Sequence, residues 1–206
     1  MFNFLKPKTA KEINLKMIDE AVKSAFRFFR DKEPRKLLNF EKLNQTEQDI
    51  IFNELVMTAI LAIVFVLNSR ILRDEHLPDS PSLRAKLSFL KEMKNQVFNN
   101  FLAWYSNFGI DKVYVDLFEK CLKMRFEEYQ EDKIRLMREL PREDIYDYEI
   151  DNELAHHELC AIQSLVVSSL FHIKRGETSP EDSFVKPYKT WLLVTYGNLK
   201  KRVNKI

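Results

Sequence analysis

The stretch from Leu55 to Leu67 reads Leu-Val-Met-Thr-Ala-Ile-Leu-Ala-Ile-Val-Phe-Val-Leu and is apolar at every position except Thr58. A helix over these residues has no polar side, so other parts of the chain must cover it all round. The run has 13 residues, whereas a helix needs about 20 apolar residues to cross a bilayer. We therefore expect a buried helix at the centre of a soluble protein, and no membrane partner.

The composition also favours a helical protein. The chain has 206 residues, 45% of them apolar, and a formal net charge of +2. This apolar fraction is ordinary for a globular domain and too high for a disordered chain. Only 3 glycines are present, too few for the turns of a β-rich fold or the crossovers of a doubly wound α/β fold. The length predicts a single domain over residues 1–206, with flexible ends at 1–8 and 200–206.

Capping signals divide the chain into about six long helices. Thr9 with Glu12, and Thr46 with Asp49, have the spacing of a capping box. Gly109 follows one apolar pattern and ends its helix. The predicted helices span residues 10–30, 46–72, 81–108, 111–139, 142–175 and 180–204, with the last bent or restarted at Pro187.

The predicted helices fall into two kinds. Residues 159–173 are nearly as apolar as the central stretch, so the helices near 46–72 and 142–175 should both be surrounded. The others carry apolar residues at spacings of three and four, which predicts one face on the core and one wet face. In the helix over 111–139 this stripe is Val113, Leu117, Cys121 and Met124. The prediction is an all-α single-domain bundle with two central helices.

The number and spacing of the cysteines indicate the cellular compartment. Cys121 and Cys160 lie far apart, without the dense even spacing of a secreted disulfide framework. Residues 1–8 contain no apolar stretch of signal-peptide length. These features predict reduced thiols and a cytoplasmic location.

Charge is unevenly distributed along the chain. Residues 1–40 hold ten basic and five acidic side chains, and residues 127–153 hold four basic and eleven acidic ones. Residues 186–206 hold six basic side chains and no acid. One interpretation is that these segments neighbour one another or are simply solvated. The other is a phosphate- or nucleic-acid-binding patch, although it lacks interleaved aromatic residues and nucleic acid is not the expected partner. Its residues would be Lys200, Lys201, Arg202 and Lys205.

One segment carries groups that could bind a metal. On a helix, Glu153, His157 and Cys160 fall within about 60° of one another. A carboxylate, an imidazole and a thiolate are all ligands for zinc or iron. Glu153 and His156 form a Glu-x-x-His pair, but di-metal bundles use this pair twice and it occurs here once. Glu54 would complete a mononuclear site if the two central helices touch. The alternative, which we favour, is a structural hydrogen-bonded contact.

Function is predicted mainly from what the sequence lacks. It contains no Gly-rich phosphate loop, nucleophile elbow or cysteine-pair zinc module, so an enzyme is not favoured. Phe26, Phe28 and Phe29 cannot all face one core, which leaves one for a partner contact. We predict a non-catalytic protein interaction or assembly module without a cofactor, contacting another protein or a second copy. The alternative is a metal-binding bundle, a hydrolase or oxidoreductase, with one zinc, iron or manganese ion.

Overall fold

The fold is all-helical, as predicted. The computed structural model describes residues 9–140, 152–176, 178–179 and 181–206, and these residues contain no β-strand. Their helices are α1 (Ala10–Arg30), α2 (Lys32–Leu37), the 3-10 helix η1 (Phe40–Lys42), α3 (Gln45–Glu75), α4 (Pro81–Ser106), α5 (Lys112–Glu139), α6 (Asn152–Ile173) and α7 (Val185–Val203).

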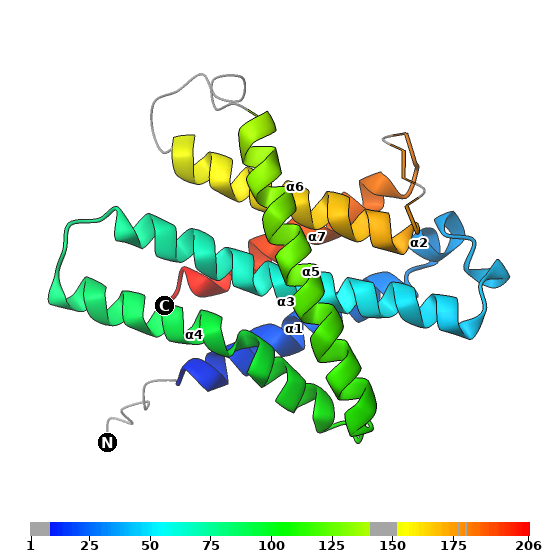
Figure 1. Ribbon diagram of the computed structural model, residues 1–206, viewed down its shortest axis with the longest axis horizontal. Coiled ribbons are helices and arrows are strands. Elements are labelled where there is room, and N and C mark those ends of the chain that lie inside the picture. The colour runs from blue at the N-terminus through cyan, green and yellow to red at the C-terminus, as the bar shows by residue number, and fades with distance from the viewer. Residues whose placement is uncertain (1–8, 141–151, 177, 180) are drawn as a thin grey trace, which may run out of the picture.

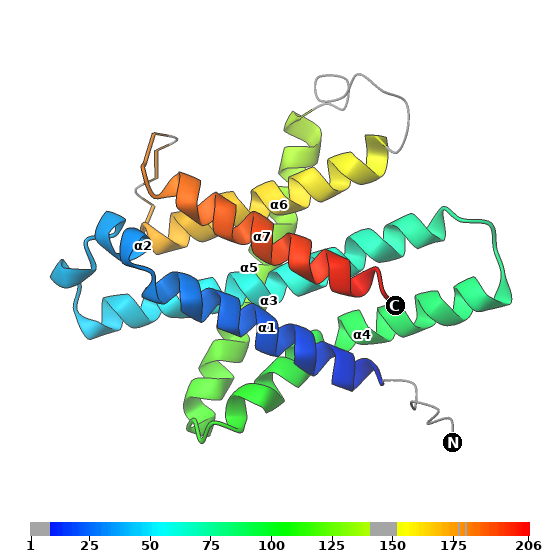
Figure 2. The ribbon, with the colours of Figure 1, turned by 180° about the vertical axis from the view of Figure 1, so that it is seen from behind.

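Helix α3 lies at the centre and contacts α1, α4, α5, α6 and α7. Figure 1 shows α3 between α4 and α6, with α5 crossing these helices on the side toward the viewer. Figure 2 shows the opposite side, which α1 and α7 cover side by side. The bundle therefore has α5 on one face and the α1/α7 pair on the other.

The central position of α3 follows from its sequence. Every residue from Leu55 to Leu67 is at most 5% exposed. The apolar part of α3 is longer than the 13-residue run suggested: in the described part of the chain, α3 is the one helix long and apolar enough to cross a membrane. In the protein, 83% of its most apolar window is buried. Neighbouring helices, rather than solvent, meet its sides.

Polar side chains fix the outer helices to one another. The Asn14 amide of α1 donates to the carbonyl oxygen of Met93 on α4, at 2.8 Å. The Trp191 indole of α7 donates to the carbonyl oxygen of Ser24 on α1, at 3.2 Å. Phe28 stacks on Trp191 with ring centroids 5.0 Å apart, so aromatic packing supports the same α1/α7 contact.

Some predicted boundaries were wrong. The capping box at the start of α3 is formed by Asn44 and Glu47 instead of Thr46 and Asp49, because the Asn44 side chain and the Glu47 carboxylate each accept from the other's backbone N–H. Helix α7 begins at Val185 rather than at residue 180, which puts Pro187 in its first turn. A proline there removes no intrahelical bond, so it does not bend the helix.

Both ends of the chain were predicted to be flexible. In the predicted flexible end at 200–206, α7 continues to Val203, whose side chain is 1% exposed. The flexible end predicted at 1–8 and the helix start predicted at 142 lie outside the described residues. The short helices α2 and η1, between α1 and α3, were not predicted. Gly109 follows the end of α4 at a φ of 74°, as its sequence position indicates.

We expect the stability of the fold to depend on the burial of α3. Replacing Ile60, which is 0% exposed, by alanine should lower the free energy of unfolding by roughly 2–5 kcal/mol. The matched control Ile50→Ala lies on the same helix, where Ile50 is 48% exposed, and should cost less than about 1 kcal/mol. Urea unfolding of both variants gives the two values. Equal losses would contradict the enclosure of α3.

Candidate functional site

Glu54 is a buried carboxylate held by α5. Its side chain is 2% exposed. The Tyr129 hydroxyl donates to Glu54 Oε1 at 2.5 Å, and Arg125 Nε donates to Glu54 Oε2 at 3.1 Å. A buried carboxylate that has both a cation and a hydroxyl donor is compensated for its loss of water.

Further polar contacts continue from Arg125 across α5 to α6. Arg125 also bonds Glu128 at 3.3 Å, and Glu128 lies 2.7 Å from Nε2 of His172 on α6. One turn further along α5, Asp132 accepts from the Ser168 hydroxyl of α6 at 2.5 Å. Polar groups thus join α3, α5 and α6 where α5 crosses the bundle.

Buried tyrosines lie beside this cluster. The Tyr188 hydroxyl contacts that of Ser169, and Tyr129 bonds Glu54. Burial raises the pKa of Tyr129 and of Tyr188 well above the usual value near 10. Both therefore remain protonated hydrogen-bond donors at neutral pH, which suits a structural role better than proton transfer.

The residues predicted as metal ligands on α6 form two separate pairs. His156 Nε2 lies 2.6 Å from the carbonyl oxygen of Leu140 and 3.6 Å from Cys160 Sγ. His157 Nε2 lies 4.0 Å from the carboxylate of Glu153. Burial raises the pKa of the Cys160 thiol, which disfavours the thiolate that a metal needs.

The side chains predicted as metal ligands are not gathered at one point. Within the described residues there is no group of three or more His, Cys, Asp or Glu side chains placed to hold a metal ion. Glu54 is directed to α5, Cys160 is paired with His156, and Glu153 with His157. The sequence indicated that Glu54 lies at the margin of the buried helix, but it could not show that Arg125 and Tyr129 would be the groups facing it.

Helix α5 has an exposed apolar face, which corrects the prediction made for it. Leu117 is 51% exposed, Met124 is 61% exposed, and Cys121 is also exposed. We call Val113, Leu117, Cys121 and Met124 the α5 outer stripe. The helix packs on the bundle through a different set of side chains, about a third of a turn away. These are Val115, Phe118, Leu122 and Tyr129.

The three phenylalanines of α1 divide between core and surface. Phe28 packs on Trp191, and Phe29 packs on Phe40 and Phe52, with the Phe29 and Phe52 ring centroids 5.1 Å apart. Phe26 is 46% exposed. Among the three, Phe26 is the most exposed, and its ring lies 6.2 Å from that of Phe52.

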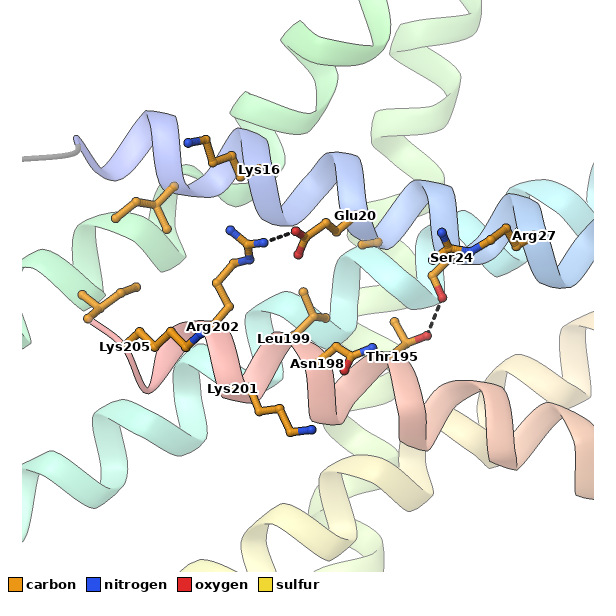
Figure 3. Close-up of a pocket in the computed structure, with 13 residues that line it drawn as sticks. Lys16, Glu20, Ser24, Arg27, Thr195, Asn198, Leu199, Lys201, Arg202 and Lys205 are labelled. Atoms are coloured by element: carbon orange, nitrogen blue, oxygen red, sulfur yellow. Dashed lines mark hydrogen bonds and ion pairs between the residues drawn. The ribbon is translucent and has the colours of Figure 1, made fainter.

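The basic residues at the end of α7 lie in two environments. Lys200 is paired with Glu158 of α6 at 2.6 Å, an acid outside the acidic segment 127–153. Lys201, Arg202 and Lys205 line a cavity between α7 and α1 (Figure 3). The contribution of α1 to this cavity was not predicted, because α1 and α7 lie near opposite ends of the chain.

Comparison with known proteins adds no family. The chain matches no protein-family model, no curated protein and no solved structure.

Buried Tyr129 should make stability depend on alkaline pH. The folded-state pKa of Tyr129 is raised, so its contribution is fully present below pH 10 and is lost as the pH rises toward the folded-state value, because the unfolded chain releases the proton first. Above pH 10 the free energy of unfolding should fall by up to about 1.4 kcal/mol per pH unit for this residue.

Tyr129→Phe tests this dependence by urea unfolding at pH 7, 9 and 11. At pH 7 the variant should lose about 1–3 kcal/mol, since Glu54 loses a donor. Between pH 9 and 11 its stability should fall less steeply than that of the wild type. Parallel pH curves would show that the Tyr129 hydroxyl is not held as described.

Proposed function

We propose that the protein is a non-catalytic assembly module that pairs with a second copy of itself through the α5 outer stripe. The observation that carries this proposal is the exposure of the stripe's large apolar side chains on one helix face. Large contiguous exposed apolar patches are characteristic of interaction surfaces, whereas scattered single residues are not.

The packing of α5 on the bundle does not require the apolar side chains of the stripe. Phe118 and Leu122 already anchor the helix, at 7% and 0% exposure. The exposed side chains therefore add a second apolar sector to α5. Tyr114, at 65% exposure, lies next to that sector, and Phe108, also at 65%, lies just before the helix. Figure 1 shows α5 on the outside of the bundle, where a partner helix has access to it.

The charges beside the stripe support a second copy as the partner. Lys112, Asp116, Lys120, Lys123 and Glu127 lie along one edge of it, within about 80° around the helix. If two α5 helices pack antiparallel about a two-fold axis between residues 119 and 120, Lys112 faces Glu127 and Asp116 faces Lys123, whereas the two copies of Lys120 meet near the axis. In a parallel pairing this edge of one helix would lie on the opposite side of the interface from the same edge of the other, so these charges would not meet. A two-fold dimer repeats each favourable contact twice.

The buried groups support the non-catalytic part of the proposal. Glu54 is bonded to Arg125 and Tyr129, and Glu128 to Arg125 and His172, so these groups are engaged in holding helices together. The free cysteines Cys121 and Cys160 are in keeping with a reducing compartment, and we propose the cytoplasm.

A charged residue in the stripe should abolish the dimer. We expect the wild-type protein to have twice the mass of the 24.6 kDa chain in sedimentation equilibrium, and Leu117→Glu to be monomeric, because two carboxylates would be buried at the interface. Val194→Glu is the matched control: Val194 is 58% exposed on α7, so this variant should remain dimeric. Circular dichroism checks that both variants fold. A monomeric wild type would refute the proposal.

A charge exchange tests the antiparallel arrangement. Asp116→Lys alone should weaken the dimer by about tenfold or more, because it sets the introduced lysine of one copy against Lys123 of the other on both sides of the axis. Adding Lys123→Asp should restore dimerisation by re-creating opposite charges. Failure of the double variant to recover, with Asp116→Lys weakened, would exclude this pairing.

A further inference from the structure

A charged groove lies on the face of the molecule opposite α5. Helices α1 and α7 form its walls, and its volume is about 700 Å³. Figure 3 shows Arg202 reaching from α7 across the groove to Glu20 on α1. We call this cavity the α1–α7 groove. It is lined by Ile13, Lys16, Glu20, Ala21, Ser24, Arg27, Thr195, Asn198, Leu199, Lys201, Arg202, Lys205 and Ile206.

The groove is strongly basic. Five of the residues that line it are cations, and Glu20 is the one acidic side chain among them. Arg202 is paired with Glu20. The structure gives the other four cations no carboxylate partner in the part of the chain that it describes. They are Lys16, Arg27, Lys201 and Lys205. An anionic ligand would therefore meet several uncompensated positive charges.

The shape of the groove is long rather than compact. Ile13 and Arg27, at its limits on α1, are roughly 20 Å apart along the helix. The two walls are held together where the Ser24 and Thr195 hydroxyls bond at 2.8 Å. Cations spread along this length suit a row of charges better than one compact phosphate group, which needs several donors at one point.

The apolar residues of the groove narrow the ligand class further. Ile13, Leu199 and Ile206 lie among the cations. A linear polyphosphate would leave these side chains without an apolar partner. None of the residues that line the groove is aromatic, so it offers no stacking surface for nucleobases. A ligand that carries both acidic and aliphatic groups, in contrast, would match both the cations and the aliphatic side chains of the groove.

We infer that the α1–α7 groove binds an acidic amphipathic helix of a partner protein. Four turns of helix have the length of the groove. The aliphatic side of such a helix packs toward Leu199 and the isoleucines, and its carboxylates reach the basic rims, as in other helix-in-groove contacts. Glu20 occupies Arg202 in the absence of the partner, so it acts as an internal competitor for one of the bound carboxylates.

The test uses a fluorescein-labelled peptide of about 15 residues with leucine at every third or fourth position and glutamate elsewhere. Binding to the full chain is followed by fluorescence anisotropy. Lys16→Glu with Lys205→Glu should weaken binding by about tenfold or more, because two attractive contacts become repulsive. The matched control, Lys36→Glu with Lys42→Glu, changes the net charge equally at exposed positions outside the groove, and should bind as the wild type does.

Glu20→Gln supplies a readout that misfolding cannot imitate. Removing the competing carboxylate frees Arg202, so the peptide should bind more tightly, by about threefold or more. Equal weakening by the groove and control variants would overturn the inference, as would unchanged or weaker binding to Glu20→Gln. Polyglutamate or oligothymidylate of the same length binding as tightly as the peptide would also overturn it, since the groove would then recognise charge alone. Leu117→Glu should bind the peptide normally, which separates this inference from the dimer.

Discussion

Helix α3 has no polar side between Leu55 and Leu67, and this constraint organises the rest of the molecule. Each of the five other long helices contacts α3. A polar group that enters the region must bring its own partner, because no water is available there. Glu54 shows the consequence: it is bonded by Tyr129 and Arg125 of α5 and is not left free for a ligand. The polar contact that fixes α5 to the bundle is thus a direct result of an acid placed on the most buried helix.

The two surfaces that we propose to be functional lie on opposite sides of this centre. Helix α5 crosses one face of the bundle (Figure 1), and α1 and α7 cover the other (Figure 2). In a dimer formed through α5, both α1–α7 grooves would face outward. Self-association and partner binding would then be compatible, and a dimer would present two grooves to one partner or to two.

The predictable features of this fold are those that depend on local sequence. The apolar run identified the central helix, and Thr9 with Glu12 identified the start of α1, since a capping box satisfies backbone groups within a single turn. The prediction of which face of α5 packs on the core was wrong. The helix carries two apolar sectors, and the spacing of apolar residues does not tell which of them is covered. Val113 and Leu117 had the expected spacing, yet Phe118 and Leu122 face the core.

The candidate sites were harder to predict because they depend on pairs of distant segments. Lys16 and Lys205 line one groove although they lie at opposite ends of the chain. Arg125 faces Glu54 across 71 positions of sequence. The metal-site hypothesis combined residues that were close along one helix with an acid on another, and the orientation of that acid was decided by a third helix.

The enclosure of α3 also has a consequence for synthesis of the chain. The ribosome completes α3 at Glu75, but the covering helix α7 ends only at Val203. At roughly 5–20 residues per second, the nascent chain carries an incompletely covered apolar helix for on the order of ten seconds. In that interval its most apolar window, with the mean hydropathy of a membrane span, is exposed surface on which an unfinished chain can aggregate. Helix α1, made before α3, is the first part of the cover available to shorten that exposure.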